Sequence, residues 1–412
     1  MSTPVDDGAS ARLPRPRRRA LWLLAAAFLI SCGGGVDSGG TGAPMASSFA
    51  SGPITGFGSV IVNGVRFDDT TAVVTDAAGN ARSRNDLRLG MTAEVRGSAI
   101  AVDAAGNSVA TARSIVFGSE IVGPVVANDL VGRTFVVLGH TVDVAATTVF
   151  ESSLVGGQAA LALGDIVEVY ARIDTASGHY AATRVERKAA AATFELRGVV
   201  ASLDTAARQF SLGSTRISYA GVPAAGVPAA GVPATLANGR FVRVMLNASP
   251  GAGGVWNAVT IADATSRIDE GDEAKVDGLV SAFVSTTRFS VDGTAVDASS
   301  ASFPNGGANI ALGRRVEVEG RALAGVLVAT RVTLIAEGSG GGEEFEVSGA
   351  IALVDALAQT FTLRNVVVSY SGSVDFRNGT VTNIVVGQRL EAKGTLSADG
   401  TRLQASRIQF DR

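Results

Sequence analysis

Few residue types in this chain could carry out covalent or acid–base chemistry. The 412 residues include one cysteine, Cys32, and two histidines, His140 and His179. One cysteine cannot build a disulfide framework, and two histidines fall short of the three or four ligands of a zinc site. No G-x-S-x-G elbow, HExxH motif, P-loop or complete G-x-G-x-x-G is present. We therefore predict no enzymatic activity, no cofactor and no metal, and we expect both histidines to be solvated turn residues.

Charged residues instead recur at fixed places. A glutamate recurs in one strand-like segment, at Glu94, Glu168, Glu317 and Glu391, and an arginine recurs in another, at Arg113, Arg184, Arg331 and Arg407. The third copy has Arg243 and Val259 at these places, so it lacks both. This joint loss predicts that the two face each other across neighbouring strands as a surface ion pair. A repeated ligand-contacting pair is the alternative. An ionisable residue also lies three positions before the opening glycine of four copies, at Glu120, Glu195, Lys275 and Glu346.

Aromatic residues divide into two groups. Phenylalanine recurs at one hairpin position, and we expect these side chains to be core anchors; they are Phe135, Phe210, Phe289 and Phe361, with Val60 in the first copy. Trp256 and Tyr180 lie in the variable final hairpins, so they are the better candidates for exposed, ligand-contacting aromatics. The acidic run at 269–273 lacks EF-hand spacing and is expected to be a solvated linker.

The start of the chain has the pattern of an export signal. Five arginines between Arg12 and Arg19 precede an apolar run at 20–30, and these 11 residues are too few to span a bilayer. The run ends in Leu29-Ile30-Ser31-Cys32, which resembles a bacterial lipobox. The resemblance implies a diacylglyceryl thioether on Cys32, cleavage before it, and a further acyl chain such as palmitate on its amine. An ordinary secretory signal remains the alternative.

The same resemblance gives an expected location. Gly33, rather than aspartate, follows the cysteine, and by resemblance to Gram-negative lipoproteins this favours the outer membrane. The Gly- and Ser-rich segment at 32–51 is predicted to be a flexible tether. Several acyl chains would anchor the protein stably to the membrane.

The remainder of the chain is five copies of one unit. A glycine that precedes an alternating strand recurs at Gly90, Gly164, Gly239, Gly313 and Gly387, in steps of 74, 75, 74 and 74 residues. Each unit contains five or six segments with the period-2 alternation of half-buried strands. Turn pairs such as Asn63-Gly64 and Asp292-Gly293 are typical of tight hairpins. We predict an all-β protein with five tandem small OB-like barrels, and a sandwich is the alternative.

The repeat markers define the domain boundaries. We predict a signal peptide at 1–31, the tether at 32–51 and repeats 1 to 5 at 52–117, 118–190, 191–265, 266–336 and 343–412, with a linker at 337–342. Repeat 3 contains the pentapeptide AGVPA three times at 220–234. Its Pro and Gly content predicts an extended, mobile surface loop.

The repeats resemble a known family. The segments "GPITGFGSVIVNGVRFDDTTA", "LRLGMTAEVRG", "EIVGPV" and "LALGDIVEV" are similar to the bacterial domain of unknown function 5666. We expect the similarity to be strongest in repeats 1 and 2 and weaker in repeats 3 to 5. The resemblance implies an exported protein or lipoprotein, and it implies no activity because none is assigned to the family.

Charge and repetition together give the expected function. The net charge is −3, and without residues 1–31 it becomes −6, from 30 basic and 36 acidic residues. This argues against nucleic acid as a partner. We expect a non-enzymatic, lipid-anchored envelope protein whose repeats bind or space other envelope components, since several weak sites on one chain gain avidity. The alternative is a receptor for an oligosaccharide or another polymer. The expected partners are the membrane, through Cys32, and envelope polysaccharide or protein.

Overall fold

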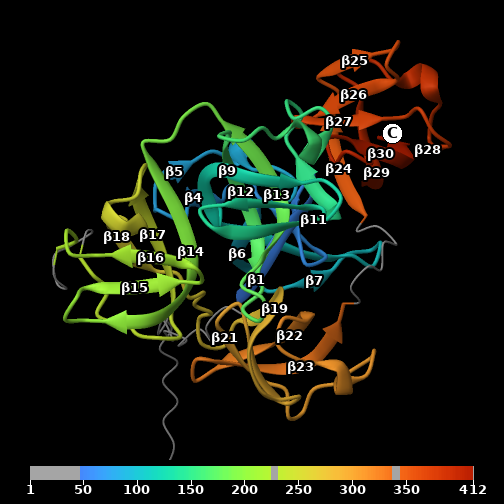
Figure 1. Ribbon diagram of the computed structural model, residues 1–412. Coiled ribbons are helices and arrows are strands. Elements are labelled where there is room, and N and C mark those ends of the chain that lie inside the picture. Colours follow the sequence, from blue (N-terminus) through green and yellow to red (C-terminus); the bar gives the residue numbers. More distant parts are fainter. Residues whose placement is uncertain (1–46, 224–230, 336–343, 412) are drawn as a thin grey trace, which may run out of the picture. The chain divides into compact units, whose positions relative to one another are not determined.

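The computed structural model describes residues 47–223, 231–335 and 344–411 (Figure 1). These residues form strands joined by turns and by short 3-10 helices. The prediction of an all-β protein is therefore confirmed. Among these same residues, no helix is both long enough and apolar enough to cross a bilayer.

Repeat 2 illustrates the architecture that all five repeats share. Its strands are β9 (Ile121–Asp129), β10 (Thr134–Val137), β11 (His140–Phe150), β12 (Ile166–Ile173) and β13 (Tyr180–Lys188). The first three pair in antiparallel order, β11 pairs in parallel with β13, and β12 pairs with both β13 and β9. The sheet thus closes on itself as a five-stranded barrel of the OB type, with the 3-10 helix η2 (Gly157–Ala160) before the fourth strand.

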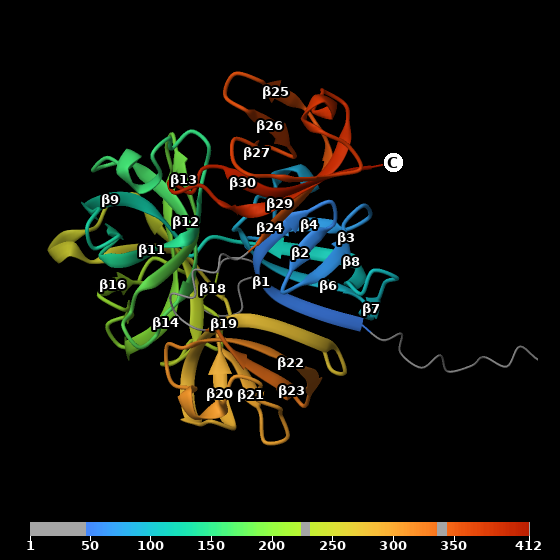
Figure 2. The same cartoon turned by 90° about the vertical axis from the view of Figure 1, so that its right-hand side faces the viewer.

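The other repeats close in the same way (Figures 1 and 2). Repeat 1 has β1 (Ser47–Phe57), β2 (Val60–Val62), β3 (Val65–Asp68), β6 (Thr92–Ser98) and β8 (Ser108–Phe117), with β4 (Val73–Asp76), β5 (Ala81–Arg82), β7 (Ala101–Val102) and η1 (Arg84–Asp86) between them. Repeat 3 has β14 (Thr193–Asp204), β15 (Gln209–Leu212), β16 (Thr215–Ser218), β17 (Phe241–Asn247), η3 (Ala252–Gly254) and β18 (Trp256–Asp263). Repeat 4 has β19 (Glu273–Ser285), β20 (Arg288–Val291), β21 (Thr294–Asp297), η4 (Gly307–Asn309), β22 (Arg315–Leu323) and β23 (Val326–Leu334). Repeat 5 has β24 (Phe345–Ala350), β25 (Leu353–Asp355), β26 (Thr360–Leu363), β27 (Val366–Ser369), β28 (Asp375–Arg377), η5 (Val381–Asn383), β29 (Arg389–Leu396) and β30 (Leu403–Phe410).

The recurring glycine has the same structural role in every repeat. All five have a positive φ, between 78° and 88°. In each barrel its N–H donates to a carbonyl in or directly after the first strand, for example Gly164 to Val125 at 2.8 Å and Gly313 to Val280 at 2.9 Å. Only glycine adopts this backbone conformation without steric cost, which explains why the position recurs along the chain.

Every barrel also contains a β-bulge at one equivalent place. The pairing of the last two long strands shifts at Arg96/Gly97, Tyr170/Ala171, Met245/Leu246, Glu319/Gly320 and Lys393/Gly394. A Cβ on Gly320 would overlap the carbonyl oxygen of Val328, and one on Gly394 would overlap that of Gln404. The bulge bends the strand pair and thereby helps a small sheet to close.

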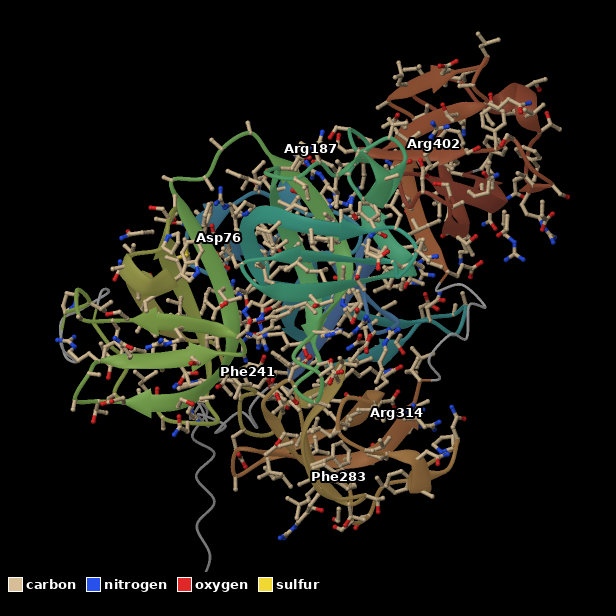
Figure 3. All side chains as sticks on the ribbon, in the orientation of Figure 1. Asp76, Arg187, Phe241, Phe283, Arg314 and Arg402 are labelled. Atoms are coloured by element: carbon tan, nitrogen blue, oxygen red, sulfur yellow. The ribbon has the colours of Figure 1, made fainter. Side chains whose placement is uncertain are left out.

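The recurring phenylalanines fill the barrel interiors, as predicted. Phe135, Phe210, Phe289 and Phe361 are at most 4% exposed, and each lies opposite a β-branched residue of the third strand. Alternate residues of the same strands point outward. Phe283 on β19, labelled in Figure 3, contrasts with them because it is 40% exposed.

The first strands also join one repeat to another. β1 pairs in parallel with β19, from Ser48↔Glu273 to Ser51↔Val276, and with β24 at Gly56↔Glu346. β9 pairs in antiparallel fashion with β14 at Glu195↔Val122. The outward faces of the paired parts of these strands are therefore packed against neighbouring repeats, whereas other parts, such as Phe283 on β19, are exposed.

Two predicted loops differ in the structure. Strand β1 begins at Ser47, so residues 47–51 belong to the first barrel and not to the tether. The described ends of the AGVPA segment are packed, because Val222 is 1% exposed within the core of repeats 2 and 3 and the Val232 N–H donates to the Pro223 carbonyl at 3.0 Å. The segment is therefore anchored through Val222, while Ala220, Gly221, Pro223 and Ala234 are exposed, as predicted for a surface loop. Residues 224–230 and the predicted linker lie outside the described residues.

Candidate functional site

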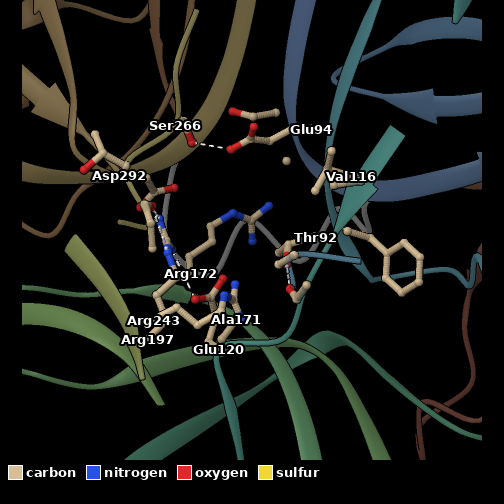
Figure 4. A pocket seen from close by; sticks show the side chains of 18 of the residues that line it. Thr92, Glu94, Val116, Glu120, Ala171, Arg172, Arg197, Arg243, Ser266 and Asp292 are labelled. Atoms are coloured by element: carbon tan, nitrogen blue, oxygen red, sulfur yellow. Dashed lines mark hydrogen bonds and ion pairs between the residues drawn. The ribbon is translucent and has the colours of Figure 1, made fainter. Parts of the chain in front are cut away.

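Charged side chains from four repeats line a pocket of about 240 Å³ (Figure 4). Arg172 comes from β12, Arg197 from β14, Arg243 from β17 and Asp277 from β19. Glu94, Glu120, Asp263 and Asp292 complete the ionisable lining. The pocket thus gathers, in one place, groups that are spread over about 200 residues of sequence.

Strand alternation explains why these charges meet. On β14, Phe194 and Leu196 belong to the apolar core, so Arg197 points away from its own barrel. On β19, Val276 and Val280 are in the core of repeat 4, and Asp277 points outward in the same way. Arg197 and Asp277 lie where other repeats cover the outward face of their strands, so both are buried.

Most of the charged groups in the pocket have ion-pair partners. Asp277 is 7% exposed and accepts from Arg172 at 2.7 Å and from Arg315 at 2.7 and 2.9 Å. Burial alone would raise the pKa of Asp277, but the charge of Arg172 and the hydrogen bonds from Arg315 lower it to about 2. Glu120 pairs with Arg197 at 3.1 Å.

Further contacts fix the other two arginines of the pocket. Arg243 is held by Glu195 and by the carbonyl oxygen of Ser119. Arg197 also donates to the Ala264 carbonyl at 3.0 Å, and its guanidinium lies 5.0 Å from the centre of the Phe241 ring. These contacts hold both guanidinium groups in defined positions.

Two polar atoms of the pocket lining have no partner among the described residues. They are Nε of Arg172, whose residue is 8% exposed, and Oδ1 of Asp292. Asp292 occupies the first position of the β20–β21 turn with φ 46° and approaches Gly278, where a Cβ would collide with its carboxyl group. Burial raises the pKa of Asp292 to about 7, although the charge of Arg197 opposes this shift.

The raised pKa of Asp292 predicts a pH dependence of stability. The pKa of this carboxyl group is about 7 in the folded protein and 3.8 in the unfolded chain, so the folded protein binds the proton more tightly. The free energy of unfolding therefore falls as the pH rises from about 4 to 7. Asp292→Asn should therefore stabilise the protein by about 1–2 kcal/mol more at pH 8 than at pH 5, allowing for the group's partial exposure. Urea denaturation at both pH values measures this difference.

Asp297→Asn is the matched control. Hydrogen bonds from Ser299 lower the pKa of Asp297, so this group stays ionised from pH 5 to 8. Its substitution should change the free energy of unfolding equally at both pH values. A pH-independent effect of Asp292→Asn would contradict the prediction.

The two predicted ligand-contacting aromatics differ in position. Tyr180 is 2% exposed and its hydroxyl donates to the Arg197 carbonyl at 2.6 Å, so the expectation that it is exposed is wrong. Its ring also contacts the ring of His140, with 5.2 Å between the ring centres. Trp256 is half-buried, lies 5.9 Å from the Phe194 ring, and lines a second pocket of about 280 Å³ with Pro124, Ser214 and Arg216.

The predicted Glu–Arg pairs do not form. Glu168 lies opposite Glu186, Glu317 opposite Thr333 and Glu391 opposite Gln409. The arginines lie opposite residues two positions further along, and Arg113 is itself the bulged residue of repeat 1. Glu168 pairs instead with Lys188, and Glu391 pairs with Lys393 at 3.3 Å. The turn and the bulge together set this register, and no residue pattern predicted it.

Three further predictions concern His140, the acidic run at 269–273 and Cys32. His140 is 3% exposed and hydrogen-bonds Thr215 at 3.0 Å, so it is not a solvated turn residue, and burial lowers its pKa to about 4. In the acidic run at 269–273, Asp272 is buried and accepts from the Ser47 hydroxyl, which corrects the expectation of a solvated linker there. Cys32 and the signal peptide lie outside the described residues.

The charged pocket was not predicted from the sequence, although one recurring set of ionisable residues contributes to it. The ionisable residues near the opening glycines all form ion pairs, Glu120 with Arg197, Glu195 with Arg243, Lys275 with Glu319, and Glu346 with Arg66 and Lys393. Two of these pairs, Glu120 with Arg197 and Glu346 with Arg66, join different repeats. Arg172 and Asp292 have no such periodic signal. Across the described parts of the chain, no group of three His, Cys, Asp or Glu side chains is arranged to hold a metal ion.

Comparison with known proteins supports the repeat assignment. Residues 122–186, 277–333 and 348–409 match the family model described as "Domain of unknown function (DUF5666)". These segments are repeats 2, 4 and 5, so the expectation of the strongest similarity in repeats 1 and 2 is wrong for repeat 1. A solved structure described as "drosophila Unr CSD456" matches 52% of this chain and 96% of its own, with 13% identity and a TM-score of 0.13. No curated protein matches the chain.

Proposed function

We propose that this protein is a lipid-anchored component of the bacterial cell envelope with a non-enzymatic binding and scaffold role. The observation that carries the proposal is the joining of closed barrels through their first strands, β1 with β19 and β24, and β9 with β14. Such joining would present the surfaces of several barrels to partners in a defined order. Repetition of one module suits avidity for an extended envelope polysaccharide or protein.

The non-enzymatic role is supported by the state of the charged pocket. Asp277 and Glu120 are engaged by guanidinium groups, which is the arrangement of a structural ion-pair network. A guanidinium group does not give up its proton in a protein, so these pairs are poor acid–base catalysts. We propose a binding role for the pocket and no catalytic step.

The membrane association is proposed from the sequence pattern around Cys32. We expect Cys32→Ser to move the protein from the outer-membrane fraction to the soluble fraction, because the substituted residue cannot form the thioether to diacylglycerol. Cell fractionation, together with labelling by a palmitate analogue, measures this. Ser38→Ala in the adjacent segment is the control and should leave both readouts unchanged. Retention of Cys32→Ser in the outer membrane would contradict the lipid anchor.

Trp256 favours a second candidate function, binding of an oligosaccharide or another polymer. Its half-buried ring lines an open pocket beside Arg216 and Ser214, and an aromatic face with neighbouring polar groups suits a sugar ring. We expect Trp256→Ala to weaken retention on immobilised peptidoglycan or exopolysaccharide at least tenfold. Phe283→Ala, which removes an exposed aromatic from repeat 4, should have no effect. Equal retention of the two variants would remove this candidate.

A further inference from the structure

Repeat 5 has an exposed apolar surface where its first strand ends. Val385, Val386 and Leu353 are 54%, 64% and 62% exposed, and we call these three residues the repeat-5 patch. The Gly387 N–H donates to the Ile351 carbonyl at 2.8 Å, which brings the two segments of the patch side by side. Large aliphatic side chains that gather in this way on a surface are typical of a contact site, whereas single scattered ones are not.

The two segments that form the patch carry no charge. Residues 349–354 (GAIALV) and 380–388 (TVTNIVVGQ) contain no Asp, Glu, Lys or Arg. The centre of a protein–protein interface is depleted of charged residues in the same way. The composition of the patch therefore favours a protein partner that buries it by apolar contact.

The equivalent surface of repeat 1 is already covered by another barrel of the chain. Leu89 and Gly90 correspond to Val386 and Gly387, and Leu89 is only 2% exposed. Arg184 of repeat 2 donates to the Leu89 carbonyl at 3.0 Å, and a Cβ on Gly90 would collide with the backbone of β13. A Cβ on Gly387 would have no atom within 4 Å. This surface is thus one on which barrels of this chain pack, and in repeat 5 it is open.

The same surface is less open or less apolar in the other three repeats. In repeat 4, a Cβ on Gly313 would lie 2.7 Å from the Asp174 carboxylate of repeat 2. In repeat 2, Val126 lines the Trp256 pocket together with Ser214 of repeat 3. Repeat 3 has Asn238 in place of the aliphatic residue before its recurring glycine. Repeat 5 therefore offers the most favourable surface for a further barrel.

We propose that two copies of this chain associate through their repeat-5 patches, which face each other across a two-fold axis. A barrel of the same chain is the partner that the equivalent surface has in repeat 1. An uncharged apolar surface is complementary to itself, and a two-fold dimer requires this because both subunits contribute the same residues. The proposal adds self-association to the proposed function and does not depend on the lipid anchor.

Disulfide trapping in the full chain tests the contact. Cys32 is the only cysteine, so Cys32→Ser gives a background without any thiol. In that background, Val386→Cys should form a disulfide-linked dimer on mild oxidation at least tenfold faster than Val102→Cys. Val102 on β7 of repeat 1 is 72% exposed, so the control thiol is at least as accessible. Non-reducing gel electrophoresis measures both rates.

Sedimentation velocity of the Cys32→Ser chain gives an independent measurement. The sedimentation coefficient should rise with protein concentration. Val386→Asp places a charge in the patch and should weaken self-association at least tenfold, whereas Val102→Asp should leave it unchanged. Both valines are exposed, so neither change should unfold the protein, and melting temperatures check this.

Three outcomes would overturn the proposal. The first is a sedimentation coefficient that does not change with concentration, and the second is equal trapping of Val386→Cys and Val102→Cys. The third is loss of self-association in Leu163→Asp but not in Val386→Asp, which would place the contact on repeat 2. Membrane retention through Cys32 is measured separately, so each of these results leaves the anchored scaffold proposal standing.

Discussion

Asp277→Ala is expected to lower the free energy of unfolding by about 3–5 kcal/mol, because it leaves the buried Arg172 without its carboxylate. The change also removes two hydrogen bonds from Arg315 and opens the contact between repeats 2 and 4. Urea denaturation at pH 7 followed by circular dichroism measures the loss. Since the pKa of Asp277 is about 2, the effect should be constant between pH 5 and 8.

Asp269→Ala is the matched control for this prediction. Asp269 also pairs with an arginine, Arg96 at 3.0 Å, but its side chain is 74% exposed. An exposed pair contributes only about 0.2–1 kcal/mol, so this variant should be nearly as stable as the unsubstituted protein. Equal, small losses in both variants would mean that the ion pairs between repeats contribute little to stability.

Phe135→Ala should destabilise the protein by a similar amount, about 3–5 kcal/mol. The ring is completely buried in the barrel of repeat 2, and its removal would leave a cavity among Val137, Val142 and Val169. The loss should be visible in the urea transition and in the hydrogen-exchange protection of β10. The same strand position is filled by phenylalanine in four repeats, so Phe361→Ala should behave alike in repeat 5.

Phe283→Ala tests whether the stability loss depends on burial of the ring or on residue type alone. Phe283 is 40% exposed on β19, so its removal creates no closed cavity and should cost less than about 1 kcal/mol. A loss in Phe283→Ala as large as that in Phe135→Ala would contradict the assignment of the recurring phenylalanines as core anchors. The pair also serves the polymer-binding experiment, where Phe283→Ala is the control.

Local patterns in the sequence were sufficient for the individual barrel. Gly164 and its counterparts recur because each has a positive φ, and Asp292-Gly293 forms the tight turn that its residue types favour. Alternation identified the strands, and the recurring phenylalanines identified their inward faces. These features depend on residues that are neighbours in the chain, so a single repeat already contains them.

The register between neighbouring strands could not be predicted from the sequence. The Glu–Arg pairing failed because the hairpin register places each arginine opposite the residue two positions after the glutamate, and the bulge at Tyr170/Ala171 accounts for only one residue of that offset. Tyr180 and His140 were expected to be exposed because they lie near turns, yet residues of repeat 3 pack against both. A turn residue is buried or exposed according to what packs above it, and that partner can come from any part of the chain.

The amino-acid sequence by itself determined the five-fold repeat, the all-β class and the barrel-closing glycines, since short-range backbone preferences and strand alternation decide these. Only the tertiary structure decided which first strands pair, and therefore which outward charges become buried. Arg172 and Asp277 are 105 residues apart, and each lies on the face that an isolated barrel would turn to water. Their pairing, and the pocket around them, arises because β1 pairs with β19 and β9 pairs with β14. Contacts between repeats of similar sequence leave no local pattern that distinguishes one partner from another.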